Sequence, residues 1–338
     1  MQRKILIVAL LLLATVHCVR SLFYENVNLL SFERLEAGTE NLPYQGRCLV
    51  IPLLRWAHSN PALNRAAATA NLHNHAPDGH RYGPEPETPE KLISMAVGVL
   101  CLIGLGIVAT LAGRVTGAKL WWLPWVMVLV FLYTGYAART KQNFWHVFDL
   151  PAYFLFGLGT WFVLRRQWLP LLLLMPFAAA NRETAIFLAA LWLGAVWEEP
   201  NRWKTALQVL GLVAAWAPVR IVIWSWYRYN QTEVGGRIVD NLHELTSMRS
   251  WPQIASAFGF LLPILFLYRR DLSASSQRLF WAMMPCLAVI LWYGVWLETR
   301  IFGEFFLLAA LFLVEIIDKR LLRDAIGGPS CPAPSSSR

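Results

Sequence analysis

Long apolar runs alternate with short polar clusters along almost the whole chain. An apolar helix of about 17–25 residues matches the hydrocarbon core of a bilayer, which is about 30 Å thick. We therefore predict an all-α, polytopic integral membrane protein whose transmembrane domain covers residues 1–320. It has about ten spans, at 4–19, 93–113, 120–137, 150–164, 167–180, 184–197, 205–223, 252–268, 279–297 and 301–317.

One apolar run, residues 167–197, is too long for a single crossing. As one helix it would be about 46 Å long. We predict two short helices that meet at Asn181, with Pro170 and Pro176 interrupting the first of them. A single tilted helix would reverse the orientation of every later span.

Basic pairs at the ends of apolar runs predict the orientation. Lysine and arginine concentrate on the cytoplasmic side, which places Arg165-Arg166, Arg269-Arg270 and both termini there. The predicted first outer loop is 20–92, with an interfacial helix near 47–57 and a flexible part at 58–91. Residues 321–338 are predicted to form a disordered cytoplasmic tail.

Composition supports a membrane protein and argues against soluble chemistry. Hydrophobic residues make up 57% of the 338 residues, charged residues only 15%, and there are 17 tryptophans. Soluble domains carry about 25% charge. The net charge of +9 does not indicate nucleic acid, because the basic residues lie at the ends of apolar runs. The sequence also contains no P-loop and no dinucleotide-binding glycine pattern.

Three clusters of mixed charge interrupt the apolar sequence. NRET (181–184) contains Arg182 and Glu183; LETRIFGEF (297–305) contains Glu298, Arg300 and Glu304; and QNFWHVFDLP (142–151) contains His146 and Asp149. Ionisable residues at membrane depth usually mark functional sites. The predicted topology places all three clusters on the outer face. A structural alternative for NRET is a helix start with Asn181 as its N-cap and Glu183 in its first turn.

The first outer loop adds acidic residues and an arginine. Glu33, Glu36 and Glu40 precede Arg47, which begins the short apolar stretch RCLVIPLLRWA. Each glutamate alone fits an ordinary solvated loop. As a set beside a membrane surface, they are candidates for a general base.

The order of these parts resembles GT-C-type membrane glycosyltransferases, whose large first outer loop holds acidic residues and an interfacial helix. LPYQGRCLVIPLL is similar to a PY-x-x-R-x-L-x-P-L-L pattern of bacterial integral membrane relatives, and NRET and ETRIFGE resemble their charged turns. The resemblance implies transfer of a sugar from a polyprenyl-phosphate donor to a glycan, lipid or protein acceptor on the outer face of a bacterial inner membrane.

This resemblance implies roles for particular residues. A carboxylate would deprotonate or orient the acceptor hydroxyl, and arginines would grip the lipid phosphate through two parallel hydrogen bonds. The candidate catalytic residues are Glu40, Glu36 and Asp149. The candidate substrate-binding residues are Arg47, Arg182, Glu183, Glu298, Arg300 and His146.

No metal ligand is assigned, although a divalent metal is compatible with the resemblance. His73, His75 and His80 in HNHAPDGH lack a zinc-type spacing. Two other functions remain alternatives. A Wzy-like polysaccharide polymerase would depend on arginines in two large outer loops. A lipid-linked-sugar transporter or flippase would place charges at mid-span and contain inverted repeats.

Overall fold

The computed structural model describes residues 2–73, 86–137, 144–232, 235–296 and 298–326. Most of these residues are helical and only two strands of two residues each occur among them, which confirms the predicted all-α class. The helices of the N-terminal half are α1 (Gln2–Glu25), α2 (Phe32–Ala37), α3 (Ile51–Ser59), α4 (Pro61–His73), α5 (Pro89–Val115), α6 (Leu123–Ala137) and α7 (Asp149–Leu164). The later ones are α8 (Trp168–Asn181), α9 (Phe187–Ala195), α10 (Arg202–Tyr227), α11 (Ile238–Thr246), α12 (Trp251–Ser256), α13 (Leu262–Leu267), α14 (Ala274–Tyr293) and α15 (Phe306–Ile326).

Five short 3₁₀ segments and two short strands complete the fold. The 3₁₀ segments are η1 (Tyr44–Gly46), η2 (Cys48–Val50), η3 (Glu183–Ile186), η4 (Arg269–Asp271) and η5 (Thr299–Phe305). Strand β1 (Val27–Asn28) pairs in parallel with β2 (Phe144–Trp145), with Val27 opposite Phe144. This pairing fixes the start of the first loop beside the segment that leads into α7.

The predicted count of about ten spans is not supported. Among the residues described, four helices are long and apolar enough to cross a membrane, judged by length and composition: α1, α5, α10 and α14. α6, α7, α8 and α9 are apolar but shorter. The predicted span 252–268 is split into α12 and α13, because Gly259 (φ 59°) and Phe260 (φ 63°) adopt left-handed backbone conformations between them.

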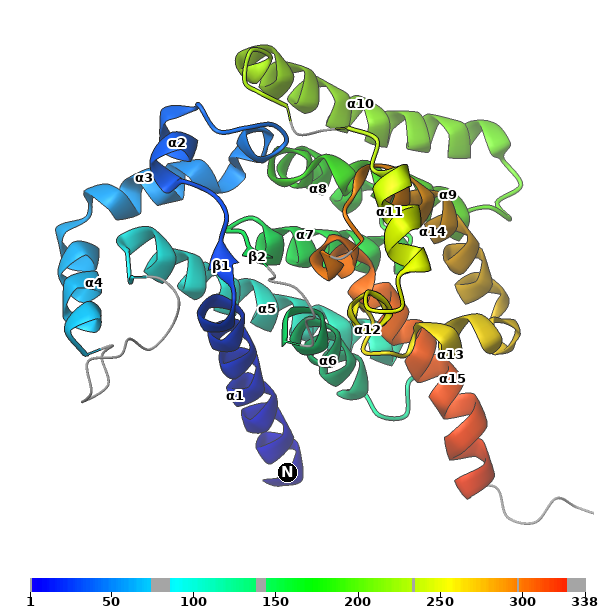
Figure 1. Cartoon of the computed structure of the whole chain (residues 1–338). Helices are drawn as coiled ribbons and strands as arrows, with labels where there is room; N and C mark the ends of the chain where they lie inside the picture. Colours follow the sequence, from blue (N-terminus) through cyan, green and yellow to red (C-terminus); the bar gives the residue numbers. More distant parts are fainter. Residues whose placement is uncertain (1, 74–85, 138–143, 233–234, 297, 327–338) are drawn as a thin grey trace, which may run out of the picture.

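Large apolar side chains cover the outside of several helices. Leu169, Leu173 and Phe177 recur every four residues on α8 and are 58%, 63% and 60% exposed. A stripe of this kind would be unfavourable against water, whereas it suits lipid. In Figure 1, α10 lies along one edge of the molecule, and the N-terminal end of α1 projects from the opposite edge.

The long apolar run is divided where the sequence indicated. α8 ends at Asn181, Arg182 is extended (φ −157°, ψ 139°), and η3 leads into α9. Pro170 and Pro176 both lie within α8 and do not interrupt it, contrary to the prediction. Asn181 does not cap the next helix either, because its amide Nδ2 donates to the carbonyl oxygen of Phe148 at 3.1 Å.

The first loop is more helical than expected. The predicted interfacial helix near 47–57 corresponds to η2 and α3, but residues 61–73, expected to be flexible, form α4. Residues 74–85 and 327–338, which include most of HNHAPDGH and most of the predicted tail, lie outside the described residues.

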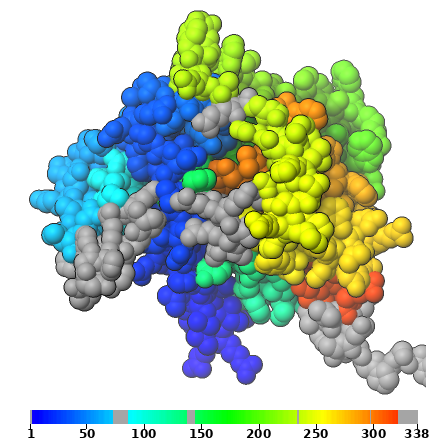
Figure 2. All heavy atoms as spheres, viewed as in Figure 1, coloured from blue at the N-terminus to red at the C-terminus, as the bar shows by residue number. Residues whose placement is uncertain are grey.

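On the face drawn in Figure 2, orange atoms from around residue 300 are visible between the blue first loop and the yellow α11–α12 segment.

A close contact between α5 and α6 gives a test of the packing. Alanine usually stabilises a helix interior over glycine by about 1 kcal/mol. A Cβ at Gly106, however, would lie 2.0 Å from the Trp125 ring, whose Nε1 donates to Thr15 of α1 at 3.2 Å. We expect Gly106→Ala to destabilise the protein by about 1–3 kcal/mol in thermal unfolding of the detergent-purified chain. Gly235→Ala, where the added methyl meets open space, is the control; stabilisation by Gly106→Ala would contradict this packing.

Candidate functional site

The extended backbone at Arg182 sends its side chain toward two acidic residues of other segments. Its Nη1 lies 3.7 Å from Oδ1 of Asp149, the first residue of α7. Its Nε lies 3.6 Å from Oε1 of Glu304 in η5. Thr184 donates a short hydrogen bond to the same Glu304 oxygen. The NRET turn is therefore fixed between α7 and η5.

Asp149 also contacts a second arginine. Nη1 of Arg300 lies 3.3 Å from Asp149 Oδ2, and Nη2 of Arg300 lies 2.5 Å from Glu298. Two tyrosines complete this corner. Tyr136 donates its hydroxyl to Asp149 at 3.4 Å, and the hydroxyl of Tyr153 donates to the Arg300 carbonyl oxygen at 2.7 Å. Asp149 thus lies between the guanidinium groups of Arg182 and Arg300.

The neighbouring Glu183 faces the first loop instead. Arg47 reaches both of its carboxylate oxygens, with Nη2 at 2.7 Å and Nε at 3.4 Å. Arg220 of α10 lies 3.8 Å from the second oxygen and donates to the Gly46 and Ala179 carbonyl oxygens at 2.7 and 3.1 Å. One carboxylate is therefore held in a fork of two arginines that come from segments far apart in the sequence.

We name these eight residues the charged network. Four guanidinium groups face four carboxylates, so the network is formally neutral. Desolvating such charges is costly, and only mutual pairing offsets that cost. Its members are Arg47, Asp149, Arg182, Glu183, Arg220, Glu298, Arg300 and Glu304.

The network is buried at its centre and reachable at its edge. The Asp149, Arg182, Arg300 and Glu304 side chains are at most 6% exposed, whereas Glu183 is 33% and Glu298 is 23% exposed. A cavity of only about 10 Å³ lies beside Arg182 and Glu304, room for about one water molecule. An approaching ligand would therefore meet Glu183 or Glu298 before it reached the buried centre.

Several buried side-chain atoms of the network make no hydrogen bond among the described residues. They are Arg182 Nε and Nη1, Arg300 Nε, Asp149 Oδ1 and Glu304 Oε2. Buried polar groups are normally hydrogen-bonded. The centre of the network therefore has unused donors and acceptors.

His146 lies beside the network. It is buried, and its ring centroid is 5.2 Å from those of Tyr44 and Phe148. The Arg47 guanidinium stacks 4.7 Å above the same Phe148 ring. His146 thus helps to pack the first loop against the start of α7, and it makes no ion pair with a carboxylate in the described residues.

Glu40 does not join the network through any of its described contacts. Its carboxylate accepts hydrogen bonds from the backbone N–H groups of Ser31 (3.3 Å) and Asn41 (2.9 Å) and lies 3.6 Å from Arg34. These partners all belong to the first loop. Glu40 therefore braces the loop around α2.

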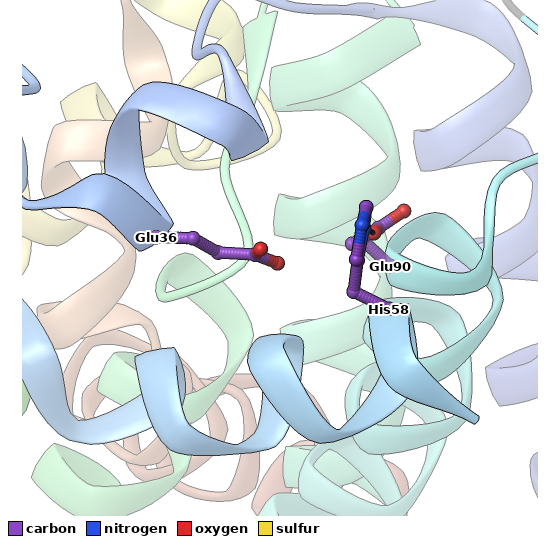
Figure 3. Close-up of side chains that lie close together, drawn as sticks. All are labelled: Glu36, His58 and Glu90. Carbon is purple, nitrogen blue, oxygen red and sulfur yellow. Dashed lines mark hydrogen bonds and ion pairs between the residues drawn. The ribbon is translucent and has the colours of Figure 1, made fainter.

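Glu36 belongs to a separate group with His58 and Glu90, drawn in Figure 3. Burial raises the pKa of the Glu36 carboxyl; the neighbouring His58 opposes this shift, and the charge of Glu90 adds to it. The hydrogen bond to Glu90 raises the pKa of the His58 imidazole, because it favours the protonated ring. Of the three candidate bases, only Asp149 shares the charged network.

Four residues that lie in or against the network were given no role from the sequence. Arg220 is the one that the sequence could have revealed, because a lone arginine within WAPVRIVIW is an ionisable residue inside an apolar span. Glu304 belonged to a noted cluster but received no function. Tyr136 and Tyr153 look like ordinary aromatic residues of apolar helices, so only the folded arrangement reveals their hydroxyl contacts.

Comparisons with protein-family models, with curated proteins and with solved structures found no match. The charged network therefore has to be interpreted from its own geometry and chemistry.

The burial of the network predicts a large effect of removing one charge. Arg300→Met removes the arginine that pairs with Glu298 and leaves Asp149 with Arg182 as its one remaining arginine among the described residues. Breaking a buried pair in this way costs about 3–5 kcal/mol. We expect the loss in thermal unfolding of the purified chain. The control is Arg237→Met, which removes an exposed pair with Asp240 worth at most about 1 kcal/mol. Equal effects of the two substitutions would show that the network is not buried.

Proposed function

We propose that this chain is a membrane-embedded glycosyltransferase that moves a sugar from a polyprenyl-phosphate donor to an acceptor. The observation that carries the proposal is the convergence of four arginines from the first loop, the NRET turn, α10 and η5 on one buried site. Apolar helices surround these arginines, so a ligand that suits both environments has an anionic group on an apolar chain. A bacterial inner membrane, an outer-face site and cytoplasmic termini are parts of the same proposal.

The arginine fork around Glu183 is the proposed phosphate site. Guanidinium groups bind carboxylate and phosphate with the same two-pronged geometry. Because the network is formally neutral, an incoming phosphate would compete with Glu183 for Arg47 and Arg220. Glu183 is the more exposed partner of the fork, so it can swing away without leaving a buried charge unpaired.

Asp149 is the proposed group that acts on the acceptor. In the transfer, the acceptor oxygen forms a bond to the anomeric carbon while the bond from that carbon to the phosphate oxygen breaks. The acceptor proton passes to the carboxylate, and the phosphate oxygen keeps the electron pair. Arginines near the leaving phosphate stabilise the charge that develops there. Glu36 and Glu40 are less suited to this role because their described contacts lie within the first loop and at α5.

Access from one face is consistent with this arrangement. Orange atoms from around residue 300 are visible between the first loop and α11–α12 in Figure 2. Glu298, at the start of this segment, is the partly exposed member of the Arg300 pair. An acceptor would therefore approach Asp149 from the Glu298 side.

Binding of the donor's lipid phosphate is the direct test. We expect undecaprenyl phosphate to raise the unfolding temperature of the purified chain, whereas undecaprenol, which has the same apolar chain and no phosphate, does not. Arg47→Lys and Arg220→Lys should each weaken the affinity for undecaprenyl phosphate by about tenfold or more, because lysine cannot bind phosphate through two parallel hydrogen bonds. The matched control is Arg34→Lys, an exposed arginine of the same loop.

Equal stabilisation by undecaprenol would contradict the phosphate site, as would unchanged binding by the Arg47 and Arg220 variants. Chemistry is tested separately with vesicles that contain the chain and a labelled polyprenyl-phosphate sugar. Transfer of the label to an acceptor supports a transferase. Movement of the intact lipid between leaflets without transfer would instead indicate a flippase.

A further inference from the structure

A second cluster of ionisable side chains joins the first loop to α5. Glu36 of α2, His58 of α3 and Glu90 in the first turn of α5 each offer one ligand atom, and these atoms all lie within 4.8 Å of one another. Figure 3 shows the Glu36 side chain pointing toward His58 and Glu90 from the opposite side. Three helices therefore contribute to one small polar site.

The surroundings hold these side chains in place. Glu90 is buried, with only 6% of its side chain exposed, and its Oε1 lies 2.6 Å from His58 Nδ1. Arg55 donates through Nε and Nη2 to the carbonyl oxygen of Glu36, which fixes the end of α2 on α3. The His58 side chain is 63% exposed, so the site opens to solvent.

One carboxylate oxygen of Glu36 makes no hydrogen bond within the described part of the chain. This oxygen, Oε1, is buried. A buried carboxylate oxygen without a donor is unfavourable, and the Glu36 carboxylate lies close to that of Glu90. A cation between the two carboxylates would interact favourably with both.

We propose that Glu36, His58 and Glu90 bind a divalent transition-metal ion, with Zn²⁺ as the best match. One imidazole and two carboxylates suit zinc, whereas magnesium and calcium prefer oxygen ligands alone. Three protein ligands would leave a fourth position for water, and the two carboxylates would neutralise the ion. The proposal is independent of the glycosyltransferase function and of the charged network.

Small adjustments bring the ligands into range. Metal–ligand distances of about 2.0–2.2 Å in a tetrahedral site place ligand atoms about 3.3 Å apart. The His58–Glu90 contact at 2.6 Å must therefore widen, and His58 is exposed enough to rotate. Bound zinc would then fasten α2 and α3 to the beginning of α5.

The test is zinc binding by the whole chain, purified through an affinity tag that contains no histidine. Because His73, His75 and His80 could also bind zinc, they are replaced by glutamine in the background used for all measurements. We expect one Zn²⁺ per chain in competition with a chromophoric chelator, and no competition from excess Mg²⁺. His58→Gln and Glu36→Gln should each weaken binding by about tenfold or more, at least as much as the loss of a supporting outer-shell group.

The matched control is Glu33→Gln, which removes the same charge from an exposed position of α2. It should bind zinc like the background protein. Cobalt substitution gives a second readout: visible bands of a tetrahedral ion without a thiolate charge-transfer band, since no cysteine belongs to the cluster. The proposal is wrong if the background chain binds no zinc, if Glu36→Gln and His58→Gln bind as Glu33→Gln does, or if cobalt reports a thiolate ligand.

Discussion

The pairing of buried charges between distant segments is the constraint on which the arrangement of this chain depends. An unpaired charge in an apolar interior costs far more than most contacts contribute. Arg182 and Glu183 can be neutralised only if α7, η5, α10 and the first loop all approach the NRET turn. Apolar attraction is not directional, whereas these ion pairs require particular residues of distant segments to meet.

Much of the fold and part of the site could be predicted from the sequence. Apolar length indicated the helices, and the charged clusters indicated Arg182, Glu183, Asp149 and Arg300, which do lie together. The span count failed because apolar composition does not reveal breaks such as the left-handed turn at Gly259 and Phe260. Glu40 and Glu36 could not be separated from the true members of the network, because loop glutamates look alike until their partners are known.

The first loop is held at two places of different chemistry. Arg47 attaches it to the charged network, and Glu36 and His58 attach it to α5 through Glu90. Between them, a small apolar cluster that includes Leu35, Leu54 and Phe148 packs α2 and α3 against the start of α7. The loop is thus a structured cover over one side of the proposed site, which links its position to any function of the network.

The contact of the first loop with the NRET turn is the central claim, and a cross-link tests it directly. Native Cys48 Sγ lies 3.8 Å from the carbonyl oxygen of Ala180. In a chain that retains only Cys48 and carries Ala180→Cys, a short thiol cross-linker applied to membranes should join the two positions. After the chain is cut between residues 48 and 180, the two fragments should run together on a denaturing gel. The two fragments of the Cys48-only chain should run separately. Separation of the Ala180→Cys fragments as well would contradict the docking of the loop on the network.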